Sequence, residues 1–162
     1  MHTPLPISLR TAQIGKCGEL LVQYRLLLLG IETAPMSTDT GIDLVAYAPH
    51  QQAALTIQVK SNLKAKPGGG RGKANLDWWL RDDSPAQLVA LVDLSSETVW
   101  LLTHAELAAH AQQKPKGRLH FYMHTDPSSG MRRDKKLSHQ HEFEHFLLSR
   151  RVQDIFGIGA TS

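Results

Sequence analysis

The segment that most constrains the fold lies between residues 41 and 61. Two β-like stretches, 41–48 and 53–61, are joined by only four residues, Pro49-His50-Gln51-Gln52. A connection this short favours an antiparallel hairpin over a crossover between parallel strands. The sequence therefore predicts a β-hairpin here, with a third strand over residues 31–36 beside it.

The pairing register of this hairpin follows from its turn. If Ala48 pairs with Ala53, Asp43 lies opposite Gln58. The period-two alternation of residues 55–60 places Gln58 and Lys60 on one face of the strand. An acid, an amide and an amine then share one face of the hairpin. Asp43 interrupts an apolar stretch, and a carboxylate there is costly unless Lys60 or a divalent cation compensates it.

Periodicity and capping signals indicate the remaining elements. A long helix is expected over residues 11–29, with Thr11 able to cap its start and Gly30 to end it. Thr103 and Glu106 form a capping box for a helix reaching about Gln113. Further elements are a hairpin over 86–93 and 97–102, a strand over 118–124 and a closing helix over 138–156. This order predicts an α/β domain with a central mixed β-sheet flanked by helices, the first helix on one side and the later helices on the other.

Length and composition point to one domain. The chain has 162 residues, 41% hydrophobic and 20% charged, which argues against a disordered, collagen-like or coiled-coil protein. We expect residues 1–162 to form a single domain, with a core over about 11–124 and a C-terminal basic loop and helix over about 125–157. Apolar runs such as 26–29 are far too short to cross a bilayer. Cys17 is the only cysteine, and no export signal is visible, so a cytoplasmic protein is expected.

Two segments rich in basic residues are expected to be loops. Residues 62–74 contain no acid, and Pro67 and the following glycines predict a mobile loop rather than regular structure. Residues 125–136 form the second such loop. A solvated loop needs no partner to explain its cations, but these residues would also suit nucleic-acid phosphates. The candidate phosphate-binding residues are Lys64, Lys66, Arg71 and Lys73 in the first segment and Arg132 and Arg133 in the second.

Four short motifs occur in an order that resembles the PD-(D/E)XK nuclease superfamily, in the branch with a Gln-x-Lys signature strand. They are Gly18-Glu19, Gly30-Ile31, Gly41-Ile42-Asp43-Leu44 and Gln58-Val59-Lys60. The resemblance covers about residues 15–102 and extends to Asp77-Trp78-Trp79, which is similar in position to the segment that follows the motif in small bacterial members. It implies a restriction-endonuclease-like fold.

The resemblance also implies roles for individual residues. Asp43 would be the principal ligand of Mg²⁺ or Mn²⁺, with Glu19, Gln58 and the main-chain carbonyl of Val59 supporting it. Lys60 would lie against the scissile phosphate and stabilise developing negative charge. The implied activity is hydrolysis of phosphodiester bonds in DNA by an endonuclease, which is expected as a homodimer or higher homo-oligomer. Gln58 departs from the acid that many members carry, which makes one-metal catalysis or weak activity more plausible.

Other interpretations remain open. Taken singly, Asp43 could cap a turn, Lys60 could extend along a strand edge and Glu19 could be a solvated helix residue. The fold could also have lost catalysis and bind DNA or protein instead. A third interpretation comes from residues 141–145, which satisfy the HExxH pattern of zinc metallopeptidases, with His141 and His145 as ligands and Glu142 as base. Trp78 and Trp79 are interpreted as anchors of the basic loop to the core, and Cys17 is given no catalytic role.

Overall fold

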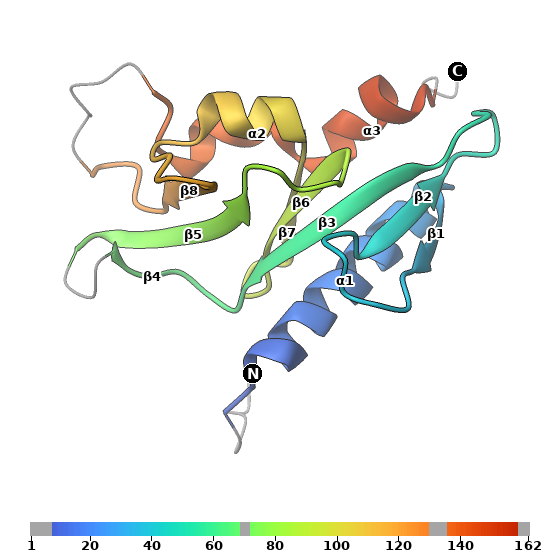
Figure 1. The fold of residues 1–162 in the computed structure, drawn as a ribbon. Coiled ribbons are helices and arrows are strands. Elements are labelled where there is room, and N and C mark those ends of the chain that lie inside the picture. The colour runs from blue at the N-terminus through green and yellow to red at the C-terminus, as the bar shows by residue number, and fades with distance from the viewer. Residues whose placement is uncertain (1–7, 69–71, 130–135, 159–162) are drawn as a thin grey trace, which may run out of the picture.

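The main sheet is mixed and has five strands. The computed structural model describes residues 8–68, 72–129 and 136–158. In the sheet the strand order is β1-β2-β3-β6-β7, and every neighbouring pair is antiparallel except β3 and β6 (Figure 1). The strands are β1 (Glu32–Pro35), β2 (Leu44–Tyr47), β3 (Leu55–Asn62), β6 (Leu88–Asp93) and β7 (Thr98–Thr103). The mixed sheet predicted from the sequence is therefore confirmed.

The β2–β3 hairpin has the predicted register. Leu44 pairs with Ile57 and Ala46 pairs with Leu55, the alignment that places Asp43 opposite Gln58. The buried side chains Leu44, Ala46 and Ile57 line one face, since alternate residues of a strand point to the same side. Burial of one face fixes the register, because a slip of one residue would expose all of these apolar side chains.

Helix α1 (Thr11–Leu28) packs closely on β3. Gly18 is buried, and a Cβ atom at this position would overlap the Oγ of Ser61 in β3. The cap at the start of the helix differs from the prediction: Thr11 is the first helical residue, and the N–H of Arg10 donates to Gln13 Oε1 over 2.8 Å. Gly30 follows the helix with φ of +82°, a conformation that glycine adopts without strain.

A second sheet combines two strands that lie between β3 and β6 in the chain with a third strand that follows α2 (His104–His110). It has the order β4-β5-β8, formed by β4 (Lys66–Pro67), β5 (Ala74–Arg81) and β8 (Arg118–His124). The prediction that residues 62–74 lack regular structure is therefore wrong, because Asn62 ends β3 and the segment also contains β4 and the start of β5. Three hydrogen bonds between Thr56 and Gln87, 31 residues apart, hold the start of β6 against β3.

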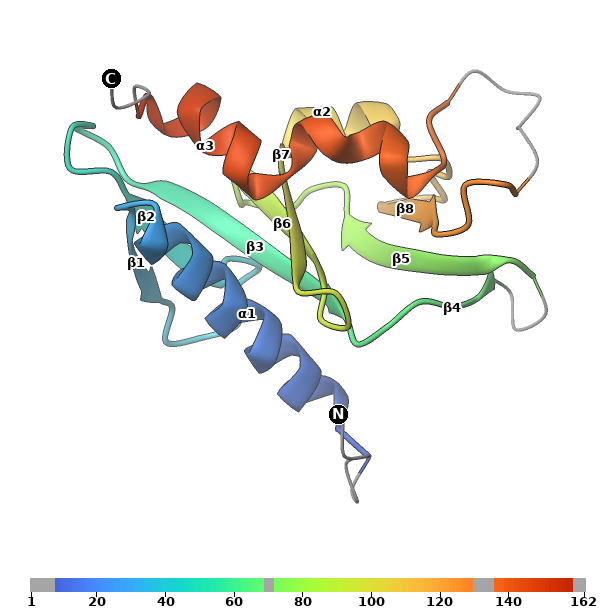
Figure 2. The ribbon, with the colours of Figure 1, turned by 180° about the vertical axis from the view of Figure 1, so that it is seen from behind.

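Two apolar cores lie on opposite faces of the main sheet. One contains Val22 and Leu26 of α1 together with Val152 and Phe156 of α3 (Leu148–Phe156). Helix α1 and α3 therefore cover the same face, seen from the front in Figure 2. The other core joins β6 and β7 to the second sheet, α2 (His104–His110) and the 3-10 helix η2 (Gln140–Phe146). The prediction that all later helices cover the second face is thus wrong for α3.

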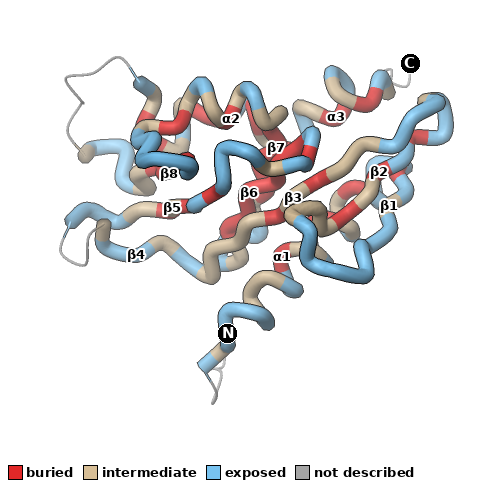
Figure 3. Tube along the Cα trace, viewed as in Figure 1, coloured by how far each residue is buried: buried red, intermediate tan, exposed pale blue. Residues whose placement is uncertain are grey.

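The most deeply buried strands are β6 and β7, which lie between the two cores (Figure 3). All six residues of β6 are buried, so this strand reads as a continuous apolar run rather than an alternation. The capping box of Thr103 and Glu106 is confirmed, although α2 ends at His110 rather than near Gln113. Among the described residues, no helix is both long and apolar enough to span a membrane.

The closing helix predicted over residues 138–156 is divided in two. The segment from Gln140 to Phe146 is a 3-10 helix, and α3 begins only at Leu148. Phe143 and Phe146, three residues apart, both point into the second core. A 3-10 helix has three residues per turn, so this spacing puts both rings on one side. Packing of the two rings thus favours the tighter helix.

Candidate active site

Asp43 lies at the end of the hairpin, where β2 begins. Its N–H donates to the carbonyl of Ile57 over 2.9 Å, and its Oδ2 accepts a 2.7 Å hydrogen bond from the N–H of Val59. The half-buried Asp43 is therefore fixed against β3 by both its backbone N–H and its carboxylate. Its other oxygen, Oδ1, has no hydrogen-bond partner in the described part of the chain.

The surroundings of Asp43 favour a bound cation. Burial raises the pKa of this carboxyl group above its ordinary value, the N–H of Val59 lowers it, and the negative charges of Glu19 and Asp39 raise it further. The ammonium group of Lys60 opposes them. The net effect is a raised pKa, which means that the protein holds a carboxylate where its charge is not fully compensated. A divalent cation would supply the missing charge.

Glu19 comes to this site from α1. Its side chain is 19% exposed, and its Oε2 forms a 2.6 Å ion pair with Lys16. The close approach at Gly18, one residue earlier, brings this part of the helix against β3. Glycine is needed there because any side chain would push the helix away from Ser61. The structure thus brings Glu19 within electrostatic reach of Asp43, as the motif order implies.

Lys60 and Gln58 line a cavity of about 680 Å³, whereas Asp43 and Glu19 are not among the described residues that line it. The side chain of Lys60 forms no hydrogen bond or ion pair with any residue that the structure describes. Gln58 Oε1 accepts a 3.0 Å hydrogen bond from the hydroxyl of Ser84. Lys60 is therefore a cation available to a ligand, whereas the amide oxygen of Gln58 already has one protein partner.

The donors around Asp43 suit a hard cation that prefers oxygen ligands. They are the carboxylates of Asp43 and Glu19, the amide oxygen of Gln58 and the carbonyl of Val59. In a strand, the N–H and C=O of one residue face the same neighbour. The carbonyl of Val59 therefore lies on the strand edge that its N–H shares with Asp43. Within the described residues, no group of three or more His, Cys, Asp or Glu side chains is placed to hold a metal ion. Two of the four predicted donors, the amide of Gln58 and the carbonyl of Val59, carry no charge.

The predicted phosphate-binding residues are dispersed. Lys66 and Lys73 line a second cavity of about 470 Å³, which also contains His120, and Lys64 is exposed. Lys136, from the second basic segment, donates instead to the carbonyl of Ala111 at the end of α2. Three predicted residues lie outside the described part of the chain: Arg71, Arg132 and Arg133.

Two residues of the 680 Å³ cavity were not singled out for this site by sequence reasoning. Trp79 and Arg118 come from β5 and β8 of the second sheet. The alternation of Leu76, Trp78 and Leu80 in β5 was the available signal for this strand. Trp78 is buried and anchors the strand as predicted, but Trp79 points outward and is 37% exposed.

The geometry of residues 139–146 does not match a zinc peptidase. Glu142 Oε2 accepts 2.9 Å hydrogen bonds from the N–H groups of Ser138 and His139, which lower the pKa of Glu142. This carboxylate therefore caps the helix rather than serving as a base. In a 3-10 helix, residues four apart such as His141 and His145 do not lie above one another on one face.

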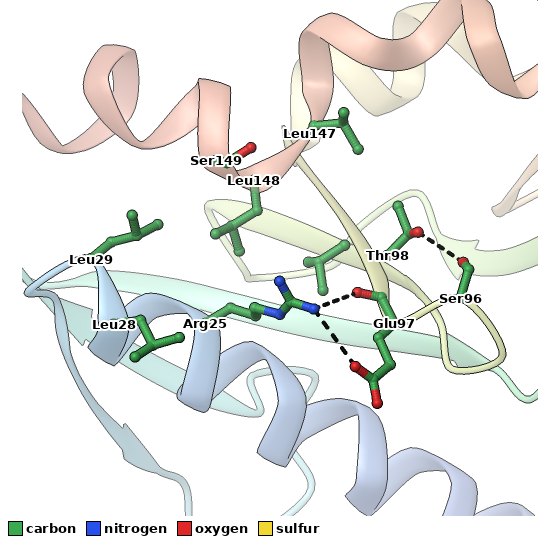
Figure 4. A pocket seen from close by; sticks show the side chains of 10 residues that line it. Arg25, Leu28, Leu29, Ser96, Glu97, Thr98, Leu147, Leu148 and Ser149 are labelled. Atoms are coloured by element: carbon green, nitrogen blue, oxygen red, sulfur yellow. Dashed lines mark hydrogen bonds and ion pairs between the residues drawn. The ribbon is translucent and has the colours of Figure 1, made fainter. Parts of the chain in front are cut away.

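Another cavity, of about 390 Å³, lies between α1, the β6–β7 turn and the start of α3 (Figure 4). Arg25 crosses it and donates to the carbonyl of Glu97 over 3.2 Å, with the Glu97 carboxylate 3.8 Å away. Leu28, Leu29 and Leu148 supply apolar walls. The only charged groups that line it are already paired with each other, so this cavity lacks the uncompensated charge found around Asp43.

Comparison with solved structures identifies the fold. The structure of the bacterial homing endonuclease I-Ssp6803I is similar with a TM-score of 0.52 and 17% sequence identity, over 76% of this chain and 84% of that chain. The structure of Hjc, a Holliday junction resolvase from the archaeal hyperthermophile Archaeoglobus fulgidus, is similar with a TM-score of 0.46 and 16% identity, over 65% and 81%. No protein-family model and no curated sequence matches the chain. The likeness to the homing endonuclease structure shows that the chain has the restriction-endonuclease-like fold, as its motifs led us to expect.

Proposed function

We propose that the protein is a divalent-metal-dependent endonuclease that hydrolyses phosphodiester bonds in DNA. One observation carries the proposal: the half-buried carboxylate of Asp43 is held against β3, close to the negative charge of Glu19 and the ammonium of Lys60. A purely structural carboxylate would be fully satisfied by donors. The arrangement on the nuclease fold instead combines carboxylates for a cation with a lysine for a phosphate.

The donor set fits Mg²⁺ or Mn²⁺, which prefer oxygen ligands. Asp43 and Glu19 would hold the ion, with the amide oxygen of Gln58 and the carbonyl of Val59 in support. When bound, the ion supplies positive charge that stabilises the negative charge developing on phosphate oxygens. The protein fixes its main ligand in advance, because Val59 orients Asp43 before any ion binds.

Lys60 is assigned to the scissile phosphate. Its ammonium group lines the cavity and has no ion-pair partner among described residues, so it is free to bind an anion. In a partly enclosed site a positive charge placed where negative charge develops lowers the activation barrier. Lys60 therefore binds and orients the phosphate and stabilises the transition state.

A homodimer completes the proposal, since cleavage of both strands of a duplex requires two sites. Four large apolar side chains on α1 support it, because each is more than half exposed. They are Leu20, Tyr24, Leu27 and Leu28. Light scattering on the purified protein tests this part: a monomer at micromolar concentration would contradict it.

A second function has its own support in Gln58. This residue supplies no charge to a cation, and its amide oxygen is already engaged by Ser84. A nuclease fold that binds DNA without cutting it would need neither a charged ligand at this position nor a metal. The alternative is thus a DNA-binding module without catalytic activity.

One experiment separates the two functions. Supercoiled plasmid and a synthetic four-way junction are incubated with Mg²⁺ or Mn²⁺ and with wild type, Asp43→Ala, Lys60→Ala or the control Lys114→Ala, which removes an exposed lysine. Cleavage by wild type and the control, lost in the other two variants, is the expected result. Cleavage that survives in Asp43→Ala and Lys60→Ala would refute the proposed site. DNA binding without cleavage by wild type would favour the binding module.

A further inference from the structure

One face of the second sheet points away from the second core, and its end lies at the cavity that Lys60 lines. Strands β5 and β8 are antiparallel, with Trp79 opposite His120 and Arg81 opposite Arg118. The inner-facing residues of both strands, such as Trp78 and Phe121, belong to the second core. The alternate residues, such as Trp79 and His120, therefore point away from this core. At one end of this face, Trp79, Arg81 and Arg118 line the same cavity as Lys60.

Trp79 is held in place by His120. The two rings are stacked with centroids 4.0 Å apart and planes inclined by 4°. His120 Nε2 lies 3.1 Å from Asp77 Oδ2, and its Nδ1 lies 3.2 Å from Gln113 Oε1. A neutral imidazole donates to one of these two oxygens, and the polar contacts at both edges hold the plane of the ring. The indole of Trp79 thus rests on a ring that cannot easily rotate.

Arg118 is held in turn by Trp79. Its Cζ lies 4.6 Å from the centre of the indole ring. Since His120 occupies one face of the indole at stacking distance, the guanidinium takes the other face. The side chain of Arg118 forms no hydrogen bond or ion pair with a described residue. Arg81, in the same cavity, instead donates two 2.9 Å hydrogen bonds to Asp83. Of these two arginines, Arg118 alone is ordered by stacking and keeps its donors unused.

We propose that Arg118 binds a backbone phosphate of the nucleic-acid substrate next to the phosphate at Lys60, and that Trp79 and His120 are positioning residues for this contact. The inference rests on the proposed function, because it places the two phosphates in one cavity. It adds a substrate-binding residue outside the Asp43 motif and outside both basic segments.

A phosphate fits Arg118 better than an unstacked base does. Stacking occupies one face of the guanidinium, whereas its N–H donors point outward in the plane. Two of these donors match two oxygens of one phosphate. The positive charge of Arg118 attracts a phosphate whatever the base sequence of the DNA. The contact therefore positions the backbone and does not distinguish between bases. The expected role is therefore to set the register of the cleaved strand over Lys60.

The test measures DNA binding without divalent metal, so that cleavage does not interfere. Fluorescent duplexes of two unrelated sequences are titrated with wild type, Arg118→Ala and the control Arg150→Ala, at several salt concentrations. Arg118→Ala should weaken binding about threefold to tenfold for both sequences and lower the slope of log affinity against log salt by about one. Arg150 is exposed on α3, on the opposite side of the main sheet, and its loss should change neither quantity. Equal effects of both variants, or no effect of Arg118→Ala, would overturn the proposal.

A double-mutant cycle tests the positioning role of Trp79. Trp79→Leu should weaken binding in the wild-type background but have no further effect in Arg118→Ala, because it acts through the guanidinium. Equal losses in both backgrounds would show that Trp79 itself stacks on a base, and would overturn the assignment. Thermal unfolding of each variant shows whether the fold is retained.

Failure of this inference and failure of the proposed function give different results. If Lys60→Ala still cuts DNA, the proposed active site is wrong whatever Arg118 does. If Lys60→Ala is inactive but Arg118→Ala binds DNA as wild type does, the proposed function stands and only the phosphate contact is refuted.

Discussion

Two aspartates at strand ends of the same sheet are treated differently by the fold. Asp93, at the end of β6, is 6% exposed; its Oδ1 accepts from the N–H and hydroxyl of Ser95, and its Oδ2 accepts from the hydroxyl of Ser96. Asp43, at the start of β2, has a single donor on one oxygen. Asp93 is satisfied by the turn that it closes. Asp43 has uncompensated charge, and this contrast supports our proposal that its carboxylate serves a ligand.

The largest expected difference between the two aspartates is in activity. Asp43→Ala should reduce the rate of plasmid cleavage by about 100-fold to 1000-fold, because the principal cation ligand is lost. Asp93→Ala should leave the rate per folded molecule within about twofold of wild type. Initial rates of plasmid nicking measure both. Comparable losses in the two variants would remove the functional distinction.

Substitution of Asp93 should reduce the stability of the protein more than substitution of Asp43. Asp93→Ala leaves the donors of Ser95 and Ser96 without their acceptor and should lower the free energy of unfolding by about 2–3 kcal/mol. Asp43→Asn keeps an oxygen for the N–H of Val59 and removes an uncompensated charge, so stability should be unchanged or raised. Urea denaturation followed by circular dichroism measures the difference. A marked destabilisation by Asp43→Asn would show that this carboxylate is structural.

The contact of Gly18 with Ser61 places α1, which carries Glu19, against β3 near Asp43. Gly18→Ala should lower the free energy of unfolding by about 1–3 kcal/mol, because the added methyl group overlaps the Ser61 hydroxyl. It should also lower the cleavage rate by moving Glu19. Gly15→Ala is the matched control, since a Cβ there meets no atom within 4 Å. If Gly18→Ala and Gly15→Ala behave alike, the close helix–strand approach is not required.

Metal binding should depend on Asp43 but not on Asp93. Mn²⁺ at a concentration several times its dissociation constant should raise the stability of wild type by about 1 kcal/mol. The same addition should leave Asp43→Asn unchanged, whereas Asp93→Ala should respond as wild type does. Thermal unfolding with and without Mn²⁺ tests this expectation. A response that persists in Asp43→Asn would place the ion elsewhere.

The smallest expected effect is in the pH dependence of stability. Burial raises the pKa of Asp43 above its ordinary value of 3.8, so the folded protein holds this proton to higher pH than the unfolded chain does. The contribution of Asp43 to stability therefore falls as the pH rises from 3.8 through the folded-state pKa. Asp43→Asn has no titrating group at this position. Its free energy of unfolding relative to wild type should therefore increase as the pH rises from 3.8 through the folded-state pKa of Asp43. A difference that stays constant with pH would contradict the raised pKa.

The Asp43 side of the molecule was predictable because its constraints are local. A four-residue connection and a period-two alternation set the register that places Asp43 opposite Gln58, and the structure has that register. The order of short motifs supplied Glu19. Whether these residues bind metal and cleave DNA stays a prediction that the variants above test.

The second sheet was harder to predict because its pairing is remote. Asp77 and His120 are 43 residues apart in the chain, and no local signal joins β5 to β8. Composition also misled, since Pro67 and the glycines after it indicated a loop where β4 begins the sheet. Arg118 was missed for the same reason. The division at Leu147 was not visible because three-residue and 3.6-residue periods differ little over seven positions.

The position of β4 and β5 between β3 and β6 in the chain has a consequence for folding. The β6–β7 hairpin closes over a short turn, whereas the parallel pairing of β3 with β6 must first close a loop that spans Thr56 to Gln87, 31 residues apart. Closing the longer loop costs more chain entropy, so the hairpin is expected to form earlier. The cavity draws on β3 and on both β5 and β8, and it is therefore assembled only when the last long-range pairings are made. Partly folded chains would therefore carry the β6–β7 hairpin but not yet the cavity lined by Lys60 and Arg118.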